Sequence, residues 1–342
     1  MAATVKDIAQ RTGLGLATIS KYLNGGHVLK KNQALIEEAI KALDFQVNEL
    51  GRGLKTGKSH TVGVVIPELS NLFSTTIISQ MEDLLRQQGY GVLVCDCRTD
   101  PKLEGEAIRF LMARRVDGLI NMPVGQGDQN LRPALQKGLP VLLMDRLIPG
   151  LDLDAVLVDN VSAARESTAH LLERGHREIG VIAGPAQVFT SSQRLMGCQD
   201  AYRQAGLDPE GQHIAFGDYT VQGGYSAAKA LIQAHPAMTA MLVTNYEMTL
   251  GAVIALNELG LTLGREMSMI GFDNMQLSQV VKPGLCVVEQ PLKDMGAALA
   301  GRMMERLRGE GVPSPQVQYL RARLCPGKSV RKVSATKSDR GR

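Results

Sequence analysis

The residues that could carry out covalent chemistry form short motif matches, and these do not add up to an enzyme site. Ser226 and Lys229 form an S-x-x-K pattern, and Lys55-Thr56-Gly57 forms a K-T-G pattern. In penicillin-binding enzymes K-T-G follows the serine, with S-D-N between them, and this chain has neither feature. Cys95 and Cys97 share a strand face, but no second Cys or His pair follows to complete a metal site. A phosphate-binding G-x-x-x-x-G-K-[ST] loop is also absent. The sequence therefore predicts no enzyme, no metal and no cofactor.

A second group of residues suits the noncovalent binding of a small polar molecule. Together they combine donors, acceptors and an aromatic ring: Asn71, Phe73, Asp145, Arg194, Asn245 and Asp273. Arg194 offers a planar bidentate donor. The oxygens of Asp145, Asn245 and Asp273 can accept hydrogen bonds from hydroxyl groups. A satisfied carboxylate at a strand end is the alternative explanation for Asp273.

The elements that must position these residues begin near Thr61. From there, ten short apolar runs, from 62–66 to 286–289, alternate with seven amphipathic segments, from 75–88 to 292–308. This order predicts parallel sheets with helices on both faces. A stretch of 61–327 is long for one such sheet, so we expect two lobes with a ligand cleft at the carboxyl ends of the strands.

Three short helices are predicted ahead of this region, in residues 1–46. Thr4 and Asp7 fit a capping box, and Gly13 can end the first helix in a left-handed conformation. A second helix covers 16–23, and Asn32 is expected to cap the third. The glycine-containing stretch 47–60 is predicted to be a linker.

Charge differs along the chain. Residues 1–60 hold nine Lys and Arg against five Asp and Glu, residues 61–327 hold 23 against 28, and residues 328–342 hold six against one. Basic ends favour a polyanion as partner, although a modest excess is also ordinary for a protein surface. The polar segment 328–342 is expected to be a disordered tail.

The composition fits a protein of the cytoplasm. The mean hydropathy is −0.04, and the chain contains no apolar run of membrane-spanning length and no apolar segment at its N-terminus. Its five cysteines are scattered and odd in number, so a disulfide framework is not expected.

The ordered motifs resemble the lactose/galactose-repressor family of bacterial regulators. The residues 4–9 and 17–25 resemble its N-terminal signature, and Asn48 with 51–54 resembles its hinge. Further similar blocks lie at 63–67, 116–118, 143–146, 174–179 and 270–274. The resemblance implies an all-α helix-turn-helix headpiece and a two-lobed α/β core that is similar to periplasmic sugar-binding proteins.

The resemblance also implies a homodimer on a palindromic site in double-stranded DNA, with the second helix in the major groove. It assigns base reading to Leu16, Ala17 and Lys21 and phosphate contacts to Thr18 and Ser20. The remaining residues expected to contact DNA are Thr4, Asn24, Asn48, Arg52, Leu54 and Lys55. Core packing is the alternative for Leu16. For Leu54, the alternatives are a wedge in the minor groove and docking on the core.

The resemblance places an effector in the cleft and adds Tyr219 as a ring that stacks on it, with core packing as the alternative. A branch that senses purines carries arginine where this chain has Val188, so a purine effector is disfavoured. A carbohydrate or sugar acid is the first expectation, and a phosphoprotein partner stays open. A solute-binding protein without a DNA role is the competing class, and the basic headpiece argues against it.

Overall fold

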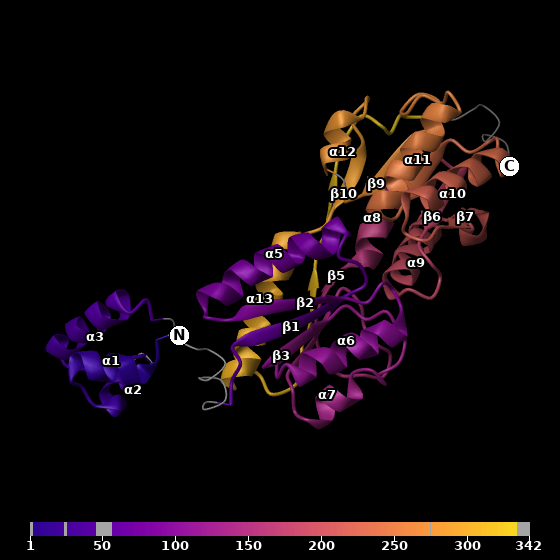
Figure 1. The fold of residues 1–342 in the computed structure, drawn as a ribbon. Coiled ribbons are helices and arrows are strands. Elements are labelled where there is room, and N and C mark those ends of the chain that lie inside the picture. Colours follow the sequence, from indigo (N-terminus) through magenta and orange to yellow (C-terminus); the bar gives the residue numbers. More distant parts are fainter. Residues whose placement is uncertain (1–2, 24–25, 46–56, 274, 334–342) are drawn as a thin grey trace. The chain divides into compact units, whose positions relative to one another are not determined.

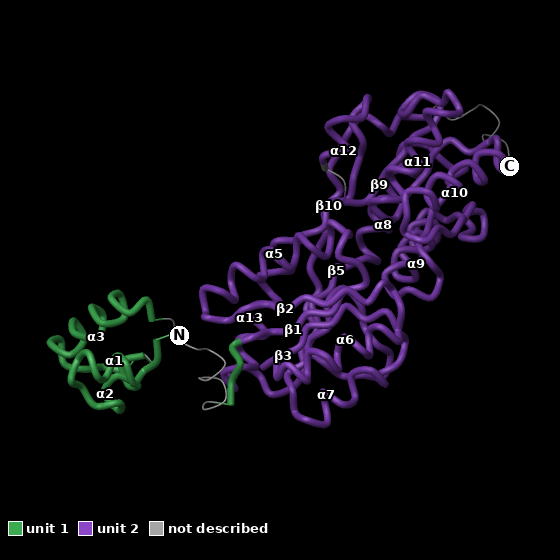
Figure 2. Tube along the Cα trace, in the orientation of Figure 1, with its two compact units in different colours: residues 1–60 green, residues 61–342 purple. Residues whose placement is uncertain are grey.

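The computed structural model describes residues 3–23, 26–45, 57–273 and 275–333. Contacts divide the chain into two compact units, residues 1–60 and residues 61–342 (Figure 2). Among the described residues, no helix is both long enough and apolar enough to cross a bilayer.

In its described residues, the first unit contains three helices: α1 (Val5–Thr12), α2 (Leu16–Leu23) and α3 (Lys30–Ala42). Asp7 accepts a hydrogen bond from the Thr4 backbone nitrogen at 2.7 Å, as a capping box requires. Gly13 ends α1 with a φ of 69°, which an L side chain rarely adopts. The predicted starts and ends of α1 and α2 are therefore confirmed.

The start of α3 corrects one prediction. The helix begins at Lys30, after Leu29, and no side chain caps it. Asn32 therefore lies inside the first turn and does not cap the helix. The prediction was wrong because Asn32 is of a residue type that often caps helices, whereas the residue in the cap position is Leu29. Leu29 is 75% exposed and has no polar side-chain atom that could mark a helix start.

The second unit contains two six-stranded sheets (Figure 1). The sheet of lobe 1 has the order β11-β5-β4-β3-β1-β2 and that of lobe 2 the order β12-β10-β9-β8-β6-β7. The strands of lobe 1 are β1 (Thr61–Ile66), β2 (Gly91–Asp96), β3 (Gly118–Asn121), β4 (Val141–Met144), β5 (Asp154–Val158) and β11 (Val317–Leu320). The strands of lobe 2 are β6 (Ile179–Ala183), β7 (His213–Phe216), β8 (Ala240–Val243), β9 (Ser268–Phe272), β10 (Cys286–Glu289) and β12 (Arg323–Cys325).

Helices cover both sheets, as the alternating pattern predicts. Lobe 1 carries α5 (Leu72–Gln87), α6 (Pro101–Ala113), α7 (Arg132–Gln136) and α13 (Leu292–Arg308). Lobe 2 carries α8 (Asn160–Glu173), α9 (Phe189–Gln204), the short η1 (Pro209–Gly211), α10 (Val221–Ala234), α11 (Tyr246–Glu258) and α12 (Met275–Val280). The chain passes between the lobes after β5, after β10 and after β11. The two-lobed α/β fold is confirmed.

Five elements were not predicted: α7, the short η1, α12, β11 and β12. All other pairings are parallel, but β12 runs antiparallel to β10, so the sheet of lobe 2 is mixed. Val317 and Tyr319 of β11 are 42% and 57% exposed at the edge of the sheet. An exposed edge strand lacks the continuous apolar run that marked the central strands.

The expected disordered tail needs a correction at its start. Ser329 is fully buried, donates its hydroxyl to the Met269 oxygen at 2.6 Å and accepts from the Cys286 backbone nitrogen at 2.7 Å. Val333 donates to the Arg174 oxygen at 2.8 Å. Residues 328–333 are therefore an ordered strap on lobe 2, while 334–342 lie outside the described residues.

Candidate functional site

Four of the predicted ligand residues directly follow strands or occupy helix starts at the carboxyl edges of the two sheets. Asp145 follows β4 in lobe 1, and Asp273 follows β9 in lobe 2. Asn71 precedes α5, and Asn245 comes just after β8 and precedes α11. The topology therefore collects residues from distant parts of the chain at the edges that face a ligand in doubly wound folds.

Arg194 is the central cation of this site. It lies on α9, is 6% exposed, and its Nε donates to the Asn160 Oδ1 at 2.7 Å. A second nitrogen donates to the Thr244 backbone oxygen, and a third lies 3.3 Å from the Gln290 Oε1. Its guanidinium carbon lies 4.4 Å from the centre of the Phe272 ring. These contacts fix its plane before a ligand arrives.

Asp273 is held beside Arg194 through Gln290. The Gln290 Nε2 donates to the Asp273 Oδ2 at 2.6 Å. Burial raises the pKa of Asp273 to about 6, against the opposing influence of Arg194 and Gln290. The negative charges of Asp145 and Glu247 contribute to this raised pKa. The protonation state of this carboxyl group therefore changes within about one pH unit of neutrality.

Asp145 is the matching carboxylate of lobe 1. It is 5% exposed, and burial raises its pKa, while the positive charges of Arg146 and Arg194 act in the opposite direction. Its Oδ2 lies 3.6 Å from the Arg146 Nε. Asp145 and Asp273 both have a φ of 66°, so each occupies a strained left-handed position at the end of its strand.

Asp145 in lobe 1 and Asp273 in lobe 2 each have one carboxylate oxygen that can still accept a hydrogen bond. Within the described residues, the Oδ1 of Asp145 and the Oδ1 of Asp273 are buried and accept no hydrogen bond. A buried acceptor without a donor destabilises the fold by about 1–3 kcal/mol. A ligand that brings hydrogen-bond donors would satisfy both oxygens.

Asn71 and Asn245 are joined by a residue that the sequence analysis did not select. Glu247 accepts from the Nδ2 of Asn71 at 3.1 Å and from the Nδ2 of Asn245 at 2.8 Å. Asn160, Thr244 and Gln290 were also missed as partners of Arg194. No sequence pattern marks them, because each is defined only by its contact with a residue far along the chain.

The two predicted aromatic residues have different surroundings. Tyr219, with a φ of 66°, lies against Gly184, where a Cβ would come within 2.3 Å of the tyrosine ring and hydroxyl. Its hydroxyl is 3.4 Å from the Thr190 Oγ1. Phe73 is half-buried and packs against the hydrophobic core. Gly184 thus makes room for Tyr219 at the end of β6.

A cavity of about 630 Å³ adjoins this site. Its wall includes Asp273, Gln290 and Tyr246 from lobe 2 and Leu72 and Thr76 from α5 of lobe 1. This volume is within the range of small-molecule sites. Tyr246 adds an aromatic surface to this wall.

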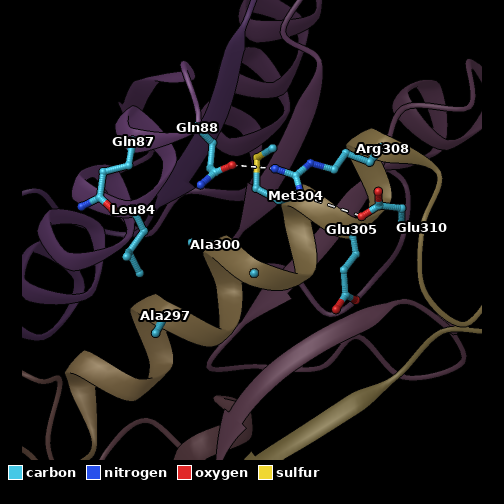
Figure 3. Close-up of a pocket in the computed structure, with 10 residues that line it drawn as sticks. Leu84, Gln87, Gln88, Ala297, Ala300, Met304, Glu305, Arg308 and Glu310 are labelled. Carbon is cyan, nitrogen blue, oxygen red and sulfur yellow. Dashed lines mark hydrogen bonds and ion pairs between the residues drawn. The ribbon is translucent and has the colours of Figure 1, made fainter.

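A second hollow, of about 350 Å³, lies between α5 and α13 (Figure 3). Leu84, Ala297, Ala300 and Met304 supply its apolar surface. Arg308 at its rim donates to the Gln88 Oε1 at 2.5 Å. None of the residues predicted to bind an effector lines this hollow.

The outer face of α2 is the candidate DNA-binding surface. Ile19 is fully buried among Ile8, Ile36 and Ala39. Leu16 on the same helix is 49% exposed, so it does not fill the headpiece core. Ala17 and Lys21 are exposed as well, and these two residues, four positions apart, share the face of the helix opposite Ile19. Leu16 is the first residue of the helix and lies beside this face.

The remaining predicted DNA contacts divide into two groups. Thr4 is exposed, and Thr18 and Ser20 are half-buried on α2. Tyr22 ties α2 to α3 through a 2.7 Å hydrogen bond from its hydroxyl to Glu37. The others lie outside the described residues: Asn24, Asn48, Arg52, Leu54 and Lys55.

The fold and site define a class: a helix-turn-helix unit on a two-lobed α/β ligand-binding core. A family model described as periplasmic binding proteins and sugar binding domain of LacI family matches residues 59–322. The chain therefore belongs to the LacI family, as its motifs predicted.

Relatives that match most of the chain support this family assignment. The chain is 30% identical over 319 residues to the HTH-type transcriptional repressor CytR of Escherichia coli K12, with 92% of each covered. It is 28% identical over 320 residues to catabolite control protein A of Priestia megaterium, covering 93% of this chain and 96% of that protein. The Lac repressor dimer bound to operator and the anti-inducer ONPF superimposes with a TM-score of 0.87 at 25% identity, covering 97% of this chain and 100% of that one.

The full-length similarity to repressors extends to the DNA-binding unit. The chain is a helix-turn-helix transcriptional regulator of this family, and the predicted function class is confirmed.

Proposed function

We propose that this protein represses transcription by binding a palindromic operator as a homodimer, and that a carbohydrate-like molecule in the cleft controls this binding. In this proposal residues 1–46 form the headpiece, 47–60 the hinge, and the core from residue 61 carries the effector site and the dimer contacts. The protein acts in the cytoplasm and has no catalytic activity.

The observation that carries the DNA-binding part is the bare outer face of α2. A three-helix unit with so small a core gains stability by burying its large apolar residues, yet Leu16 is 49% exposed. Leu16 and Ala17 can meet thymine methyl groups in the major groove, and Lys21 can reach a base edge or a phosphate. Thr4, Thr18 and Ser20 are proposed to contact the phosphate backbone.

The effector part is supported by the acceptors of the cleft. Asp145 and Asp273 each keep one buried oxygen without a donor among the described residues. Three of the Arg194 donors already have partners in the protein. The site therefore favours an uncharged ligand rich in hydroxyl groups over a sugar acid, whose carboxylate would meet two like charges.

The proposal is tested by selecting from a randomised duplex library with the full chain at two salt concentrations. We expect enrichment of a palindrome with a central pyrimidine–purine step, and weaker binding at high salt. Lys21→Ala should weaken binding and reduce the salt slope by about one. Leu16→Ala should relax the preference at one base pair and leave the salt slope unchanged.

Lys137→Ala is the matched control because Lys137 is an exposed lysine of lobe 1 and does not belong to the headpiece. The selection is repeated with neutral sugars, nucleosides and the corresponding sugar acids. A change in operator affinity with a neutral compound supports the effector assignment, and a response to acids alone contradicts it. If no duplex is enriched under any of these conditions, the proposal that α2 reads an operator sequence is wrong.

A further inference from the structure

A single carboxylate joins the two lobes at the cleft. Glu247 lies in the first turn of α11 in lobe 2, and its Oε1 accepts a hydrogen bond from the Nδ2 of Asn71 in lobe 1 at 3.1 Å. Its Oε2 accepts from the Nδ2 of Asn245 in lobe 2 at 2.8 Å. One side chain therefore engages an amide from each lobe.

Both asparagines are fixed in place by a second role. The Asn71 Oδ1 accepts from the Ser74 backbone nitrogen at 3.3 Å and so caps α5. The Asn245 Oδ1 accepts from the Met248 backbone nitrogen at 3.0 Å and caps α11. Because the Oδ1 of each asparagine caps a helix, the Nδ2 of each side chain remains to donate a hydrogen bond in the cleft. The two helix caps therefore fix the positions of the two amide groups that donate to Glu247.

A second contact between the lobes lies at α9. The Gln126 Nε2 of lobe 1 donates to the Gln187 backbone oxygen of lobe 2 at 3.1 Å. Phe189 of lobe 2 packs against the hydrophobic cluster of lobe 1. The hydrogen bond here joins two neutral groups, and Gln126 is exposed. Hydrogen bonds to a charged acceptor contribute about twice as much as neutral ones, so Glu247 is the stronger polar link.

We propose that Glu247 is a latch that holds the two lobes together when the cleft contains no effector. A ligand that takes the amide nitrogen of Asn71 or Asn245 must then displace Glu247 or share its donors. The latch adds a charge-assisted link between the lobes to the contact made by Gln126 and Phe189. This inference goes beyond the proposed function, because it concerns the distance between the lobes and holds whether or not the protein binds DNA.

The test measures the distance between the lobes in the full chain. Two dyes are attached through genetically encoded azido side chains at Lys137 in lobe 1 and Gln233 in lobe 2, both exposed. Labelled protein is mixed with a large excess of unlabelled protein, so that each dimer holds at most one labelled chain. Single-molecule energy transfer then reports the populations of closed and open lobes.

Three variants address the two hydrogen bonds. Glu247→Gln keeps the shape of the side chain but replaces one acceptor with a donor. Asn71→Asp keeps the cap on α5, since aspartate is a good N-cap, and sets a carboxylate against Glu247. The double variant Asn71→Asp with Glu247→Gln pairs the new amide with the new carboxylate. Glu106→Gln is the matched control, because Glu106 is exposed on α6 and lies outside the cleft residues.

We expect each single variant to lower the ratio of closed to open molecules by about tenfold or more, since each loses a hydrogen bond that involves a charged group. The double variant should recover most of the wild-type ratio, and Glu106→Gln should match the wild type. The latch is overturned if Glu247→Gln leaves the distance distribution unchanged. It is also overturned if the double variant is as open as Asn71→Asp alone, because the change would then not come from the pairing across the cleft.

Discussion

Lobe 1 and lobe 2 share one topology and supply different chemistry to the cleft. Five strands have matching order in the two sheets, β2-β1-β3-β4-β5 and β7-β6-β8-β9-β10. Asp145 and Asp273 occupy matching places after β4 and β9, with the same φ of 66°. The helices after the first strand of each lobe differ: the sixth residue of α9 is Arg194, whereas the sixth residue of α5 is Ile77, which is fully buried.

The helices after the third strand of each lobe differ as well. In lobe 2, α11 (Tyr246–Glu258) is capped by Asn245 and carries Glu247 in its first turn. In lobe 1, the corresponding α7 (Arg132–Gln136) has five residues and no side-chain cap. The shared topology therefore fixes where a ligand can sit, and lobe 2 supplies the buried cation and the latch that decide what can bind there.

The largest effect is expected from the cation of lobe 2. Arg194→Met should lower the free energy of unfolding by about 3–5 kcal/mol, because it leaves the buried Asp273 without its positive neighbour. Arg146→Met in lobe 1 should cost about 1–2 kcal/mol. It removes the hydrogen bond to the Pro123 oxygen at 3.1 Å and the ion pair with Asp145, but Asp145 keeps the positive charge of Arg194. Urea unfolding followed by circular dichroism measures both. Equal losses for the two variants would show that the lobes do not differ in this way.

A pH-dependent effect is expected from Asp273. Its pKa is raised from 3.8 to about 6, so the fold binds this proton more tightly than the unfolded chain does. The carboxyl therefore carries no penalty below about pH 4 and destabilises the fold as the pH rises through 6. Asp273→Asn should raise the free energy of unfolding by up to about 3 kcal/mol at pH 8 and leave it unchanged at pH 4.

Urea unfolding at a series of pH values tests this prediction. Asp145→Asn is the comparison from lobe 1, and it should show a gain in the same direction, because burial also raises the pKa of Asp145. A gain for Asp273→Asn that is the same at pH 4 and pH 8 would mean that the charge of this carboxylate is not its cause.

The smallest effect is expected from residues 328–333, the strap on lobe 2. His176 contacts this strap, because it is fully buried and lies 2.8 Å from the Thr239 Oγ1 and 3.1 Å from the Arg331 oxygen. Burial lowers its pKa, so the stability that it contributes is present at neutral pH and is lost as the pH falls below about 6.5. His176→Ala should cost about 2 kcal/mol at pH 8 and less at pH 5.

Hydrogen exchange of residues 328–333 measures whether the strap loosens in this variant. His27→Ala is the control, because His27 is exposed in the headpiece. Unchanged protection of the strap amides in His176→Ala would show that Ser329 and Val330 hold it without the histidine.

The sequence by itself determined the alternation of strands and helices, the three headpiece helices and the carboxyl-edge positions of Asp145 and Asp273. These features depend on hydrophobic periodicity, on caps such as Thr4 with Asp7, and on glycines such as Gly13, all of which act within a few residues. The helix predicted at 75–88 begins three residues earlier, at Leu72, after the N-cap Asn71, whereas the helix predicted at 292–308 begins and ends as predicted.

Only the tertiary structure decided which residues meet. Asn71 and Glu247 are 176 positions apart, and His176 and Arg331 are 155 apart. The edge strands β11 and β12, the burial of Ser329 and the partners of Arg194 have the same origin. A contact of this kind exists because two sheets and three crossings bring distant segments together, and no local pattern records which donor will then face which acceptor.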